Sequence, residues 1–451
     1  MQLRLPQAAI LLMIAAVLAL LVGKLAFNSH DQNSLLYAYG IMATSGILVL
    51  FSVRYTLYRD PYEVAQERLA ERPSLREDNP LVSIMVAAFN EERFIGRCIE
   101  SLDAQTYQNR EILVVNDAST DGTAQALARF EERPGIRVFN LDKNSGKKRA
   151  LAFAILEARG TIFIFTDSDT VMEPDAVERV VDIFKTHPDV GGVSGHSRAY
   201  NAGTNLLTSM QDTWYEGQFS IRKAYESVFG AVTCVSGPLA AFRREALFNL
   251  IPAWINDRFL GQEFRFATDR TKTALVLGSE RFAPRIRAQY PDSPFVTREW
   301  HPPRRWRIVY SQSARAFTNV PESMRSMLRQ QIRWKKSFLR NIWLTGSFYW
   351  RRPLPAAAMY YLRMVFVLIG PFIVFRHLIW LPLNGNLLSA TLYVSGVLFV
   401  GLLFAAGHKL ERPDETVWVY RPLMNFLSTF VLSWLVFYSA FTIRKMVWHR
   451  G

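Results

Sequence analysis

The sequence predicts an α/β domain with a doubly wound, mostly parallel sheet, inserted between membrane-spanning helices at the two ends of the chain. The first observation is that residues 5–23 and 32–53 contain no Asp, Glu, Lys or Arg. The second is that residues 377–408 and 422–443 are equally free of these charges. The third is that residues 81–200 alternate short β-rich runs with stretches typical of helices. A membrane span needs about 20 apolar residues, and alternating strands and helices are typical of a parallel sheet covered on both faces.

Four strands and three helices are expected in the α/β region. The strands are residues 81–88, 112–115, 136–139 and 161–166, and the helices are residues 91–105, 123–132 and 147–158. The strand segments are short and rich in Val, Ile and Phe, whereas the helical segments are longer. In a doubly wound sheet, ligands bind outside the carboxyl ends of the strands, so the residues that follow each strand are the first candidates for a site.

Two N-terminal spans are expected within residues 1–58, and they return the chain to its starting side. Arg54 and Arg59 follow the second span, which places the α/β domain, residues 59–320, in the cytoplasm. The alternative for residues 5–23 is a cleaved signal peptide, but a second span follows at once and no clear small-residue cleavage site is present. The chain is therefore expected to be a multi-pass protein of the cell membrane.

A C-terminal membrane region is expected over residues 351–451. Its apolar segments are residues 354–383, 387–408 and 421–443. Three spans would place Arg444 and Lys445 across the membrane from the α/β domain, against the tendency of basic residues to remain in the cytoplasm. A break at Gly370-Pro371 would divide the first segment into two half-crossings and restore an even number of passages.

Two further helices are expected at the membrane surface. The segment of about 205–227 places Trp214 and other apolar residues among polar ones, and residues 321–350 contain a basic, amphipathic helix over 321–343. Such helices often lie in the membrane interface, and the alternative is an ordinary helix packed on the core. Residues 281–307 are rich in Pro and Arg and are expected to be irregular.

Composition and charge exclude several classes of protein. With 50% hydrophobic residues, the chain of 451 residues is too apolar to be disordered. Its two cysteines, Cys98 and Cys234, cannot build a disulfide framework or a four-cysteine zinc site. Lys and Arg number 53 against 39 Asp and Glu, a net charge of +14. This excess clusters beside the spans, whereas a nucleic-acid-binding protein collects it on one soluble face, so no nucleic-acid partner is expected.

Polar side chains gather where the expected strands end. They are Asn90, Glu91, Asp117, Lys147, Asp167 and Asp169. Because the carboxyl ends of parallel strands meet at one edge of a sheet, these carboxylates and cations are expected on one rim. Such a rim suits a nucleoside diphosphate held through a divalent metal.

The pair Asp167 and Asp169 follows the apolar run 162–165 directly. Two carboxylates at this spacing can hold a hard cation and a ribose hydroxyl together. A solvated turn is the alternative, and the preceding strand weakens it. The sequence has neither a Gly-x-Gly-x-x-Gly turn nor a Gly-x-x-x-x-Gly-Lys-Ser/Thr loop, which argues against dinucleotide redox chemistry and P-loop phosphoryl transfer.

These residues resemble the membrane-embedded, processive members of glycosyltransferase family 2, in particular the hyaluronan and chitin synthases, over nearly the whole chain. Asn116-Asp117-Ala118-Ser119-x-Asp121-Gly122 resembles the uracil-binding turn, and Asp167-Ser168-Asp169 resembles the metal-binding motif. Val235-Ser236-Gly237-Pro238-Leu239 resembles the priming loop on which the acceptor sugar sits. Gln330-x-x-Arg333-Trp334 matches the interfacial helix motif of the processive members. The resemblance implies a GT-A-type glycosyltransferase domain.

The resemblance also implies a catalytic base. Inverting transfer needs a group that deprotonates the acceptor hydroxyl as it attacks the anomeric carbon. By resemblance this base is Asp269, in Phe266-Ala267-Thr268-Asp269-Arg270. The family usually has Gly, two acids and Arg, so Ala267 and Thr268 depart from the pattern and Asp269 is the only carboxylate in the motif. The alternative is an ordinary surface Asp.

The remaining roles concern the leaving group and the acceptor. Mg²⁺ or Mn²⁺ on Asp169, together with Arg333, would stabilise the departing diphosphate. Gln330, Arg333 and Trp334 share one helix face, so Trp334 would stack on the acceptor sugar. An Arg-Trp membrane anchor is the alternative. The C-terminal Trp448 weakly resembles the substrate-binding tail of hyaluronan synthases, and an interfacial Trp is equally compatible.

The favoured hypothesis is a processive inverting glycosyltransferase. It would take UDP-sugar donors from the cytoplasm, extend a β-linked, hyaluronan-like polysaccharide and pass that acceptor chain across the membrane in contact with lipid. The alternatives are a homopolymer synthase of the N-acetylglucosamine or glucan type and a transferase that moves one sugar onto a membrane lipid. A transporter or scaffold that retains the fold is the non-enzymatic alternative. Phe259-Leu260-Gly261, upstream of Asp269, favours the hyaluronan group.

Overall fold

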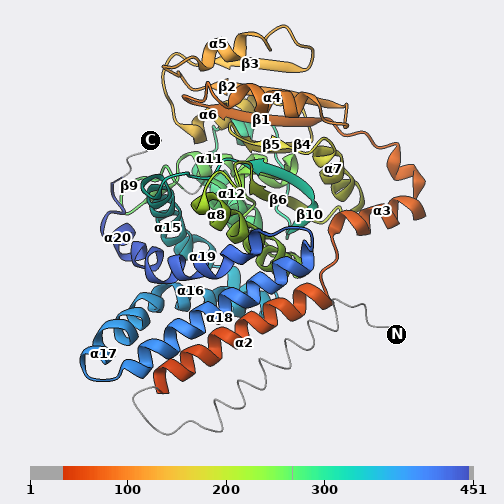
Figure 1. The fold of residues 1–451 in the computed structure, drawn as a ribbon. Helices are drawn as coiled ribbons and strands as arrows, with labels where there is room; N and C mark the ends of the chain where they lie inside the picture. The colour runs from red at the N-terminus through yellow and green to blue at the C-terminus, as the bar shows by residue number, and fades with distance from the viewer. Residues whose placement is uncertain (1–33, 267, 446–451) are drawn as a thin grey trace.

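An α/β domain lies above a group of long helices in the computed structural model, which describes residues 34–266 and 268–445 (Figure 1). The first expected span, residues 5–23, and the expected substrate-binding residue Trp448 lie outside the described residues. The α/β domain contains one eight-stranded sheet in the order β3-β2-β1-β4-β7-β6-β10-β5. The expected class, a mixed α/β domain between long apolar helices, is confirmed.

The first half of the sheet consists of the four expected strands. β1 (Val82–Ala88) pairs in parallel with β2 (Arg110–Asn116) and β4 (Ile162–Asp167), and β2 pairs in parallel with β3 (Ile136–Asn140). The three helices between them are α4 (Ile95–Asp103), α5 (Thr123–Ala128) and α6 (Lys147–Glu157). Each helix is shorter than expected. The in-register pairing of β1, β2 and β4 brings the residues that follow these strands to one edge.

The second half of the sheet is not parallel throughout. β7 (Ala240–Arg243) pairs antiparallel with both β4 and β6 (Val190–Ala199). Beyond β6 lie β10 (Arg307–Thr318) and β5 (Val171–Met172). The expected doubly wound pattern therefore describes only the first four strands. β10 was missed because its sequence, rich in Arg, Ser and Gln, lacks a clear apolar run.

Both faces of the sheet are covered by helices. On one face, Ile84 of β1 belongs to the same buried cluster as Val180 of α7 (Ala176–Thr186). On the other face, Met85 packs in a cluster with Leu151 of α6. Because neighbouring residues of β1 face two apolar layers, the strand is apolar continuously, and its sequence does not alternate with polar residues.

Residues 281–307 are partly helical, so the expectation of irregular structure is wrong over the first part of this segment. α13 (Ser279–Gln289) continues through Pro284, and α14 (Pro294–Thr297) follows. Ala283 and Ile286 are buried against the sheet domain, three residues apart on one helix face. The arginines on the other faces of α13 hide this short apolar pattern in the sequence.

Helices are present in both segments that were expected to contain them, about 205–227 and 321–343, and they lie between the sheet domain and the long helices (Figure 1). α8 (Leu206–Glu216) continues through a π-helical stretch, Gly217–Lys223, into α9 (Ala224–Val228). Asn205 caps α8, because its side chain accepts a hydrogen bond from Thr208 N. The second helix is α15 (Met324–Gly346).

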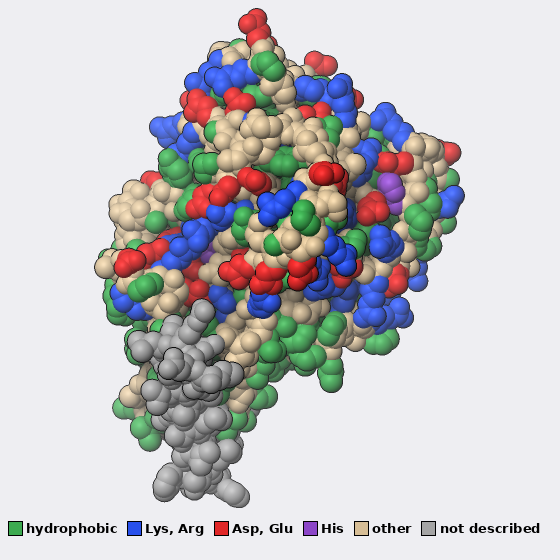
Figure 2. Space-filling model, turned by 90° about the vertical axis from the view of Figure 1, so that its right-hand side faces the viewer, with side chains coloured by type: hydrophobic (Ala, Val, Ile, Leu, Met, Phe, Trp, Pro, Cys, Tyr) green, Lys and Arg blue, Asp and Glu red, His purple; other side chains and the backbone are tan. Residues whose placement is uncertain are grey.

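Among the described residues, three helical segments are long and apolar enough to cross a membrane: Ala38–Glu71, Leu354–Leu383 and Leu387–Glu411. They overlap α2 (Ser34–Thr56), α16 (Leu354–Phe375) and α18 (Leu387–Glu411), respectively. In Figure 2, Lys, Arg, Asp and Glu side chains are spread over the upper part of the molecule, whereas hydrophobic side chains prevail among those coloured by type in its lower part. Pro371 lies inside α16, which continues to Phe375, so the expected break at Gly370-Pro371 is wrong.

The break occurs instead in the last apolar segment. α19 (Arg421–Phe430) and the helix Leu432–Phe441, which includes α20 (Leu435–Phe441), are bent by 40°. The chain then returns to the α/β domain. Lys336 Nζ of α15 donates to Lys445 O at 2.7 Å, and Gln262 Nε2 donates to Arg444 O at 3.0 Å. Arg444 and Lys445 thus lie beside the α/β domain.

Candidate active site

A cavity of about 1150 Å³ opens at the carboxyl ends of β1 and β4. α8, α12 (Thr268–Leu277), α15 and α16 contribute its other walls. Twelve of the residues singled out in the sequence line it: Asn90, Glu91, Lys147, Asp167, Asp169, Ser236, Gly237, Pro238, Asp269, Gln330, Arg333 and Trp334. Segments far apart in the sequence therefore meet in one space. Two expected residues are not among them: Asp117 does not line the cavity, and Trp448 lies outside the described residues.

Lys147 and Asp167 form an ion pair on the floor of the cavity. Asp167 is the last residue of β4, and Lys147 is the first residue of α6, directly after Gly146, whose φ is +84°. Burial by itself would lower the pKa of Lys147, but the carboxylates of Asp167 and Asp269 outweigh it and raise this pKa to about 12. Lys147 is therefore a permanent cation at the edge where the strands end.

Asp169 lies two residues beyond Asp167. Its Oδ1 accepts a hydrogen bond from Thr318 Oγ1 at 3.2 Å, and its backbone oxygen accepts one from Asn319 Nδ2 at 3.1 Å. Burial and the negative charge of Asp167 raise the pKa of Asp169 to about 6. The positive charge of Lys147 therefore only partly stabilises the ionised form of Asp169.

These carboxylates are compatible with a divalent metal. No cluster of three His, Cys, Asp or Glu side chains that could hold a metal was found in the described part of the chain. Mg²⁺, however, is commonly bound through one or two carboxylates together with substrate phosphates. Asp169 supplies such a carboxylate, and its ionised form would be stabilised by a cation. The residues present therefore fit a metal that binds together with a diphosphate.

Asp117 organises the loop in front of Lys147. The side chain is 2% exposed and accepts hydrogen bonds from Ser145 N at 2.7 Å and Gly146 N at 2.8 Å. The neighbouring turn is held by Asn90, whose Oδ1 accepts from Thr120 N at 2.8 Å. In this structure the Asp117 carboxylate supports the wall of the cavity instead of facing into it.

The loop Ser236–Pro238 is packed against both key carboxylates. Gly237 N donates to Asp269 Oδ2 at 3.1 Å. A Cβ on Gly237 would lie 2.6 Å from Asp167 Oδ2, so only glycine allows this approach. On the other side of the loop, Thr166 Oγ1 donates to Pro238 O at 2.8 Å. The loop is therefore fixed between the end of β4 and the start of α12.

Lys223 supports this loop and was not singled out from the sequence. Its Nζ donates to Ser236 Oγ at 2.6 Å and to Ser194 Oγ at 2.8 Å. Burial lowers the pKa of Lys223 to about 8. No signal in the sequence could have identified it, because the contact joins the π-helical stretch to a loop 13 residues later.

The face of α15 that carries Gln330, Arg333 and Trp334 points into the cavity. Trp334 stacks on Trp214 of α8, with ring centroids 5.6 Å apart and an angle of 16° between the planes. Burial lowers the pKa of Arg333. The second indole, Trp214, was expected only as an apolar residue of its helix. Together the two rings give the cavity a flat aromatic wall.

The comparisons with known proteins agree with this architecture. Residues 83–250, which include β1, β2 and β4, match the family described as "Glycosyl transferase family 2". The chain is similar to glycosyltransferase family 2 over this part of its α/β domain. The chain is 28% identical to the hyaluronan synthase of Streptococcus pyogenes over 426 residues, 92% of each chain. It is 29% identical over 312 residues to an N-acetylglucosaminyltransferase of Rhizobium leguminosarum bv. viciae, 67% of each chain.

A solved structure shares the fold of this chain. The mannosyltransferase PcManGT from Pyrobaculum calidifontis, in complex with GDP-Man and Mn²⁺, superposes with a TM-score of 0.50 at 20% identity. The match covers 89% of this chain and 98% of that one. This likeness concerns the fold, and the mixed sheet described above is accordingly a GT-A-type sheet.

Proposed function

We propose that this protein is a processive, inverting glycosyltransferase that polymerises UDP-sugars into a β-linked polysaccharide and passes the chain across a membrane. The observation that carries the proposal is the cavity itself. Its rim carries Lys147 and Asp169, which suit a diphosphate with a metal ion. It also contains the Asp269 carboxylate, which accepts a hydrogen bond from the Ser236–Pro238 loop, and an aromatic wall at Trp334. Helix α16 lines the same space through Arg363 and Val367.

The donor would bind at the carboxyl ends of the strands. Lys147 supplies a fixed positive charge for a phosphate oxygen, and Arg333 supplies a second cation from α15. Asp169 would hold Mg²⁺ or Mn²⁺, and such an ion neutralises the negative charge of the diphosphate as the sugar departs. The names of the Streptococcus and Rhizobium relatives support a nucleotide sugar of the hexosamine or uronic acid type.

The acceptor would lie between the loop and the aromatic wall. Asp269 takes the proton of the acceptor hydroxyl while the hydroxyl oxygen forms the bond to the anomeric carbon. The bond from that carbon to the diphosphate oxygen breaks on the opposite face, and UDP leaves with the bonding electrons. Inversion follows because the attack and the departure occur on opposite faces. Stacking on Trp334 would hold the terminal sugar over Ser236–Pro238.

The same cavity supports passage of the product. We infer that α2, α16 and α18 cross the cell membrane and that the α/β domain is cytoplasmic, with basic residues such as Arg54 and Lys445 at the cytoplasmic ends. Glu411 at the end of α18 pairs with Arg54 at 2.9 Å. This pair ties two of the long helices together on the side of the α/β domain.

The second candidate is a homopolymer synthase or a transferase that adds one sugar to a membrane lipid. The likeness to an N-acetylglucosaminyltransferase supports an enzyme that uses a single donor. In that case one UDP-sugar alone would sustain turnover. The length of the product separates a polymer synthase from a lipid transferase, because a lipid transferase makes one short product.

The test is UDP release by the purified full-length protein with Mg²⁺ or Mn²⁺, across single UDP-sugars and their pairs, followed by sizing of the product. Turnover only with UDP-N-acetylglucosamine plus UDP-glucuronate, yielding a long polymer, is the result expected. The same protein with Asp269→Asn controls for contaminating enzymes. A product that stays at one added sugar refutes processivity, and an absence of UDP release with every donor refutes the enzymatic proposal.

A further inference from the structure

The ammonium group of Lys223 holds two serine hydroxyls that differ in what they can still bind. Lys223 Nζ donates to Ser194 Oγ at 2.8 Å and to Ser236 Oγ at 2.6 Å. Burial lowers the pKa of Lys223 to about 8, so the side chain is mostly protonated at pH 7. An ammonium group can only donate hydrogen bonds. Both serine oxygens therefore accept from the lysine, and each hydroxyl keeps its own proton for another partner.

The proton of Ser194 is already used, whereas that of Ser236 is not. Ser194 is fully buried, and its Oγ donates to Gly195 O at 3.3 Å. Ser236, in contrast, lines the cavity of about 1150 Å³. In the part of the chain that the structure describes, Ser236 Oγ donates to no other group. The Ser236 hydroxyl is thus a donor that is held in place, with its proton available to a group inside the cavity.

The backbone on both sides of Ser236 is fixed by other groups. Before it, Thr233 N and Thr233 Oγ1 donate to the two carboxylate oxygens of Glu226, both at 2.9 Å. After it, Gly237 N donates to Asp269 Oδ2 at 3.1 Å. The hydrogen bond from the lysine reaches the serine side chain, so its loss would leave these backbone contacts in place.

Keeping an ammonium group at this position costs free energy. Lys223 is 8% exposed, and it forms no ion pair with a carboxylate among the described residues. Glu226 and Asp269 raise its pKa, but burial outweighs them. A buried charge without a counter-ion contributes little to stability, and an apolar side chain of similar size would pack as well. The lysine ends the π-helical stretch Gly217–Lys223, and such stretches inside α-helices are frequent at functional sites. The charge therefore indicates a role in binding.

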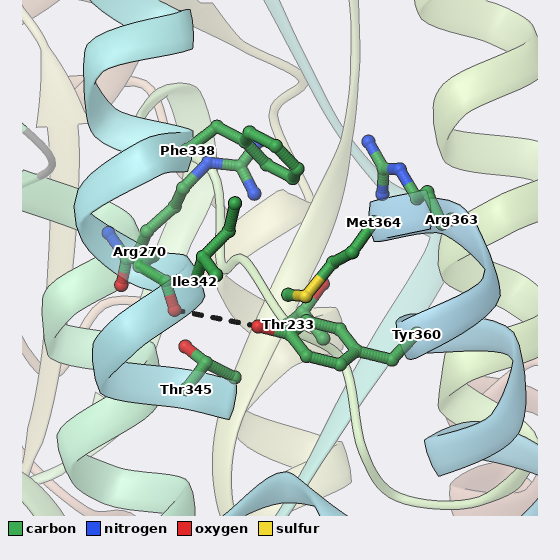
Figure 3. Close-up of a pocket in the computed structure, with 9 residues that line it drawn as sticks. Thr233, Arg270, Phe338, Ile342, Thr345, Tyr360, Arg363 and Met364 are labelled. Atoms are coloured by element: carbon green, nitrogen blue, oxygen red, sulfur yellow. Dashed lines mark hydrogen bonds between the residues drawn. The ribbon is translucent and has the colours of Figure 1, made fainter. Parts of the chain in front are cut away.

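The neighbouring space offers no second site for a sugar. A small cavity of about 20 Å³ lies between α15 and α16, and Thr233 is one of the residues that line it (Figure 3). The dashed line in Figure 3 is the hydrogen bond from Tyr360 Oη of α16 to Asn341 O of α15, at 3.5 Å. A cavity of this size holds about one water molecule. A sugar that contacts the loop must therefore lie on the side of Ser236.

We propose that Lys223 is a positioning residue that holds the Ser236 hydroxyl as a hydrogen-bond donor to an oxygen of the acceptor sugar. This inference rests on the proposed function, in which the acceptor lies over the Ser236–Pro238 loop, and it names a contact that holds the acceptor there. The attacking hydroxyl gives its proton to Asp269, so Ser236 serves a different oxygen of the sugar. Without the lysine, the Ser236 hydroxyl would be free to rotate, and its proton would no longer be directed at the sugar.

The experiment measures oligosaccharide binding to the full-length protein in lipid nanodiscs by calorimetry. The probes are two tetrasaccharides, one of N-acetylglucosamine alone and one of alternating glucuronate and N-acetylglucosamine, and the tighter-binding one serves for the variants. Lys223→Met removes the charge and keeps a side chain of similar length. We expect it to bind the tetrasaccharide about fivefold more weakly, the usual effect of one hydrogen bond. Its affinity for UDP, titrated separately, should change by less than about twofold.

A double-mutant cycle shows whether Lys223 acts through Ser236. Ser236→Ala removes the donor and should weaken tetrasaccharide binding by a similar factor. The double variant should also bind about fivefold more weakly than the native protein, because both changes remove the same hydrogen bond. In the UDP-release assay, Lys223→Met should raise the acceptor KM about fivefold and leave kcat within about twofold, as expected for lost binding.

Lys336→Met is the matched control. Lys336 is also a buried lysine, but its Nζ donates to Lys445 O and the residue does not line the cavity. This variant should bind the tetrasaccharide like the native protein. If Lys223→Met fails to fold, Lys223→Gln replaces it in the cycle, and Ser236→Ala still tests the contact by itself.

Unchanged tetrasaccharide binding in Lys223→Met or in Ser236→Ala would overturn the proposal. A loss of about 25-fold in the double variant would do the same, because independent effects multiply. Failure of both tetrasaccharides to bind the native protein would also overturn it, and UDP release would still test the proposed function separately. Coupled losses of binding without UDP release from any donor would refute the proposed function alone, whereas UDP release with native binding in both variants would refute this inference alone.

Discussion

The backbone nitrogen of Gly237 donates a hydrogen bond to Oδ2 of Asp269 at 3.1 Å. This bond joins the loop expected to carry the acceptor sugar to the carboxylate expected to activate it. A second connection reinforces it: Val235 N donates to Thr273 Oγ1 at 2.9 Å, and that hydroxyl donates to Asp269 O at 2.7 Å. These hydrogen bonds fix the position of the loop relative to the carboxylate, and a fixed relative position of acceptor and base favours catalysis.

Replacing Asp269 by Asn should reduce transfer by about 10²- to 10⁴-fold, the usual contribution of a general base. The amide keeps the size of the side chain but cannot take up the proton. UDP release measures the effect, and UDP binding by calorimetry is expected to stay unchanged. Asp292→Asn, at an exposed position, is the matched control. Turnover close to that of the native enzyme would remove Asp269 as the base.

Replacing Gly237 by Ala should reduce transfer by about 10²-fold, because a displacement of about 1 Å in a positioned group can have an effect of that size. The added Cβ would lie 2.6 Å from Asp167 Oδ2, so the loop must shift. The control is Gly396→Ala in α18, where an added Cβ meets nothing within 4 Å. Initial rates of the two variants are compared, and equal rates would contradict this close approach.

Replacing Asp169 by Asn should weaken metal-dependent binding of the donor. The variant loses the negative charge that pairs with the cation, so we expect metal affinity to fall by at least about 10- to 100-fold. Titrating Mg²⁺ or Mn²⁺ against bound UDP-sugar provides the measurement. Asp175→Asn serves as control, because Asp175 pairs with Arg179 outside the cavity. An unchanged metal dependence in Asp169→Asn would show that the metal assignment is wrong.

Replacing Trp334 by Ala should weaken acceptor binding and lower the rate of transfer by about tenfold. Trp334→Phe should retain part of that rate, because the smaller ring can still stack on the sugar. The indole lies 5.6 Å from that of Trp214. Trp343→Ala, on the same helix but 71% exposed, is the control for loss of a large apolar side chain. The readout is the rate at varied acceptor concentration. Equal losses in both variants would point to helix stability alone.

Replacing Lys272 by Met should stabilise the protein near neutral pH and reduce its gain in stability at alkaline pH. Lys272 is 1% exposed and lies 3.6 Å above the ring of Phe165, and burial lowers its pKa to about 8. Since the pKa of an unfolded lysine is about 10.4, the unfolded state binds more protons between about pH 8 and 10.4. Stability contributed by this site therefore rises with pH across that window.

The measurement for Lys272→Met is the free energy of unfolding from pH 7 to pH 10. The variant should exceed the native protein by on the order of 3 kcal/mol at pH 7, since one pKa unit corresponds to about 1.4 kcal/mol, and the difference should shrink towards pH 10. Lys143→Met, at an exposed position, should follow the native curve. A difference that does not change with pH would exclude titration of Lys272 as its cause.

Local patterns in the sequence were sufficient for half of the sheet and for most of the cavity. β1, β2 and β4 are short apolar runs, and parallel pairing brings the residues after them to one edge, so Asn90, Lys147 and Asp167 could be placed together in advance. The common helix face of Gln330, Arg333 and Trp334 on α15 could also be predicted, because residues three and four apart lie on one face of a helix. Apolar segments identified the three helices of the described residues that are long enough to cross a membrane.

Other features depend on contacts between distant segments, which no local pattern encodes. Asp117 was expected at the donor, but its carboxylate is used by the backbone of Ser145 and Gly146. Lys223 reaches Ser236 only because the π-helical stretch lies against the loop. The position of Lys445 beside Lys336 depends on a bend between α19 and α20 that composition does not reveal.

The sequence by itself determined the α/β class, the long apolar helices and the residue types of the rim, because hydrophobic periodicity and residues at strand ends are local properties. The tertiary structure decided which of those residues share a cavity and which support its walls. It also brought together Arg222, Arg270, Lys335 and Arg363, four cations that are unremarkable along the chain. The physical reason is that burial and mutual proximity, which set the electrostatic character of a site, arise only when distant elements pack.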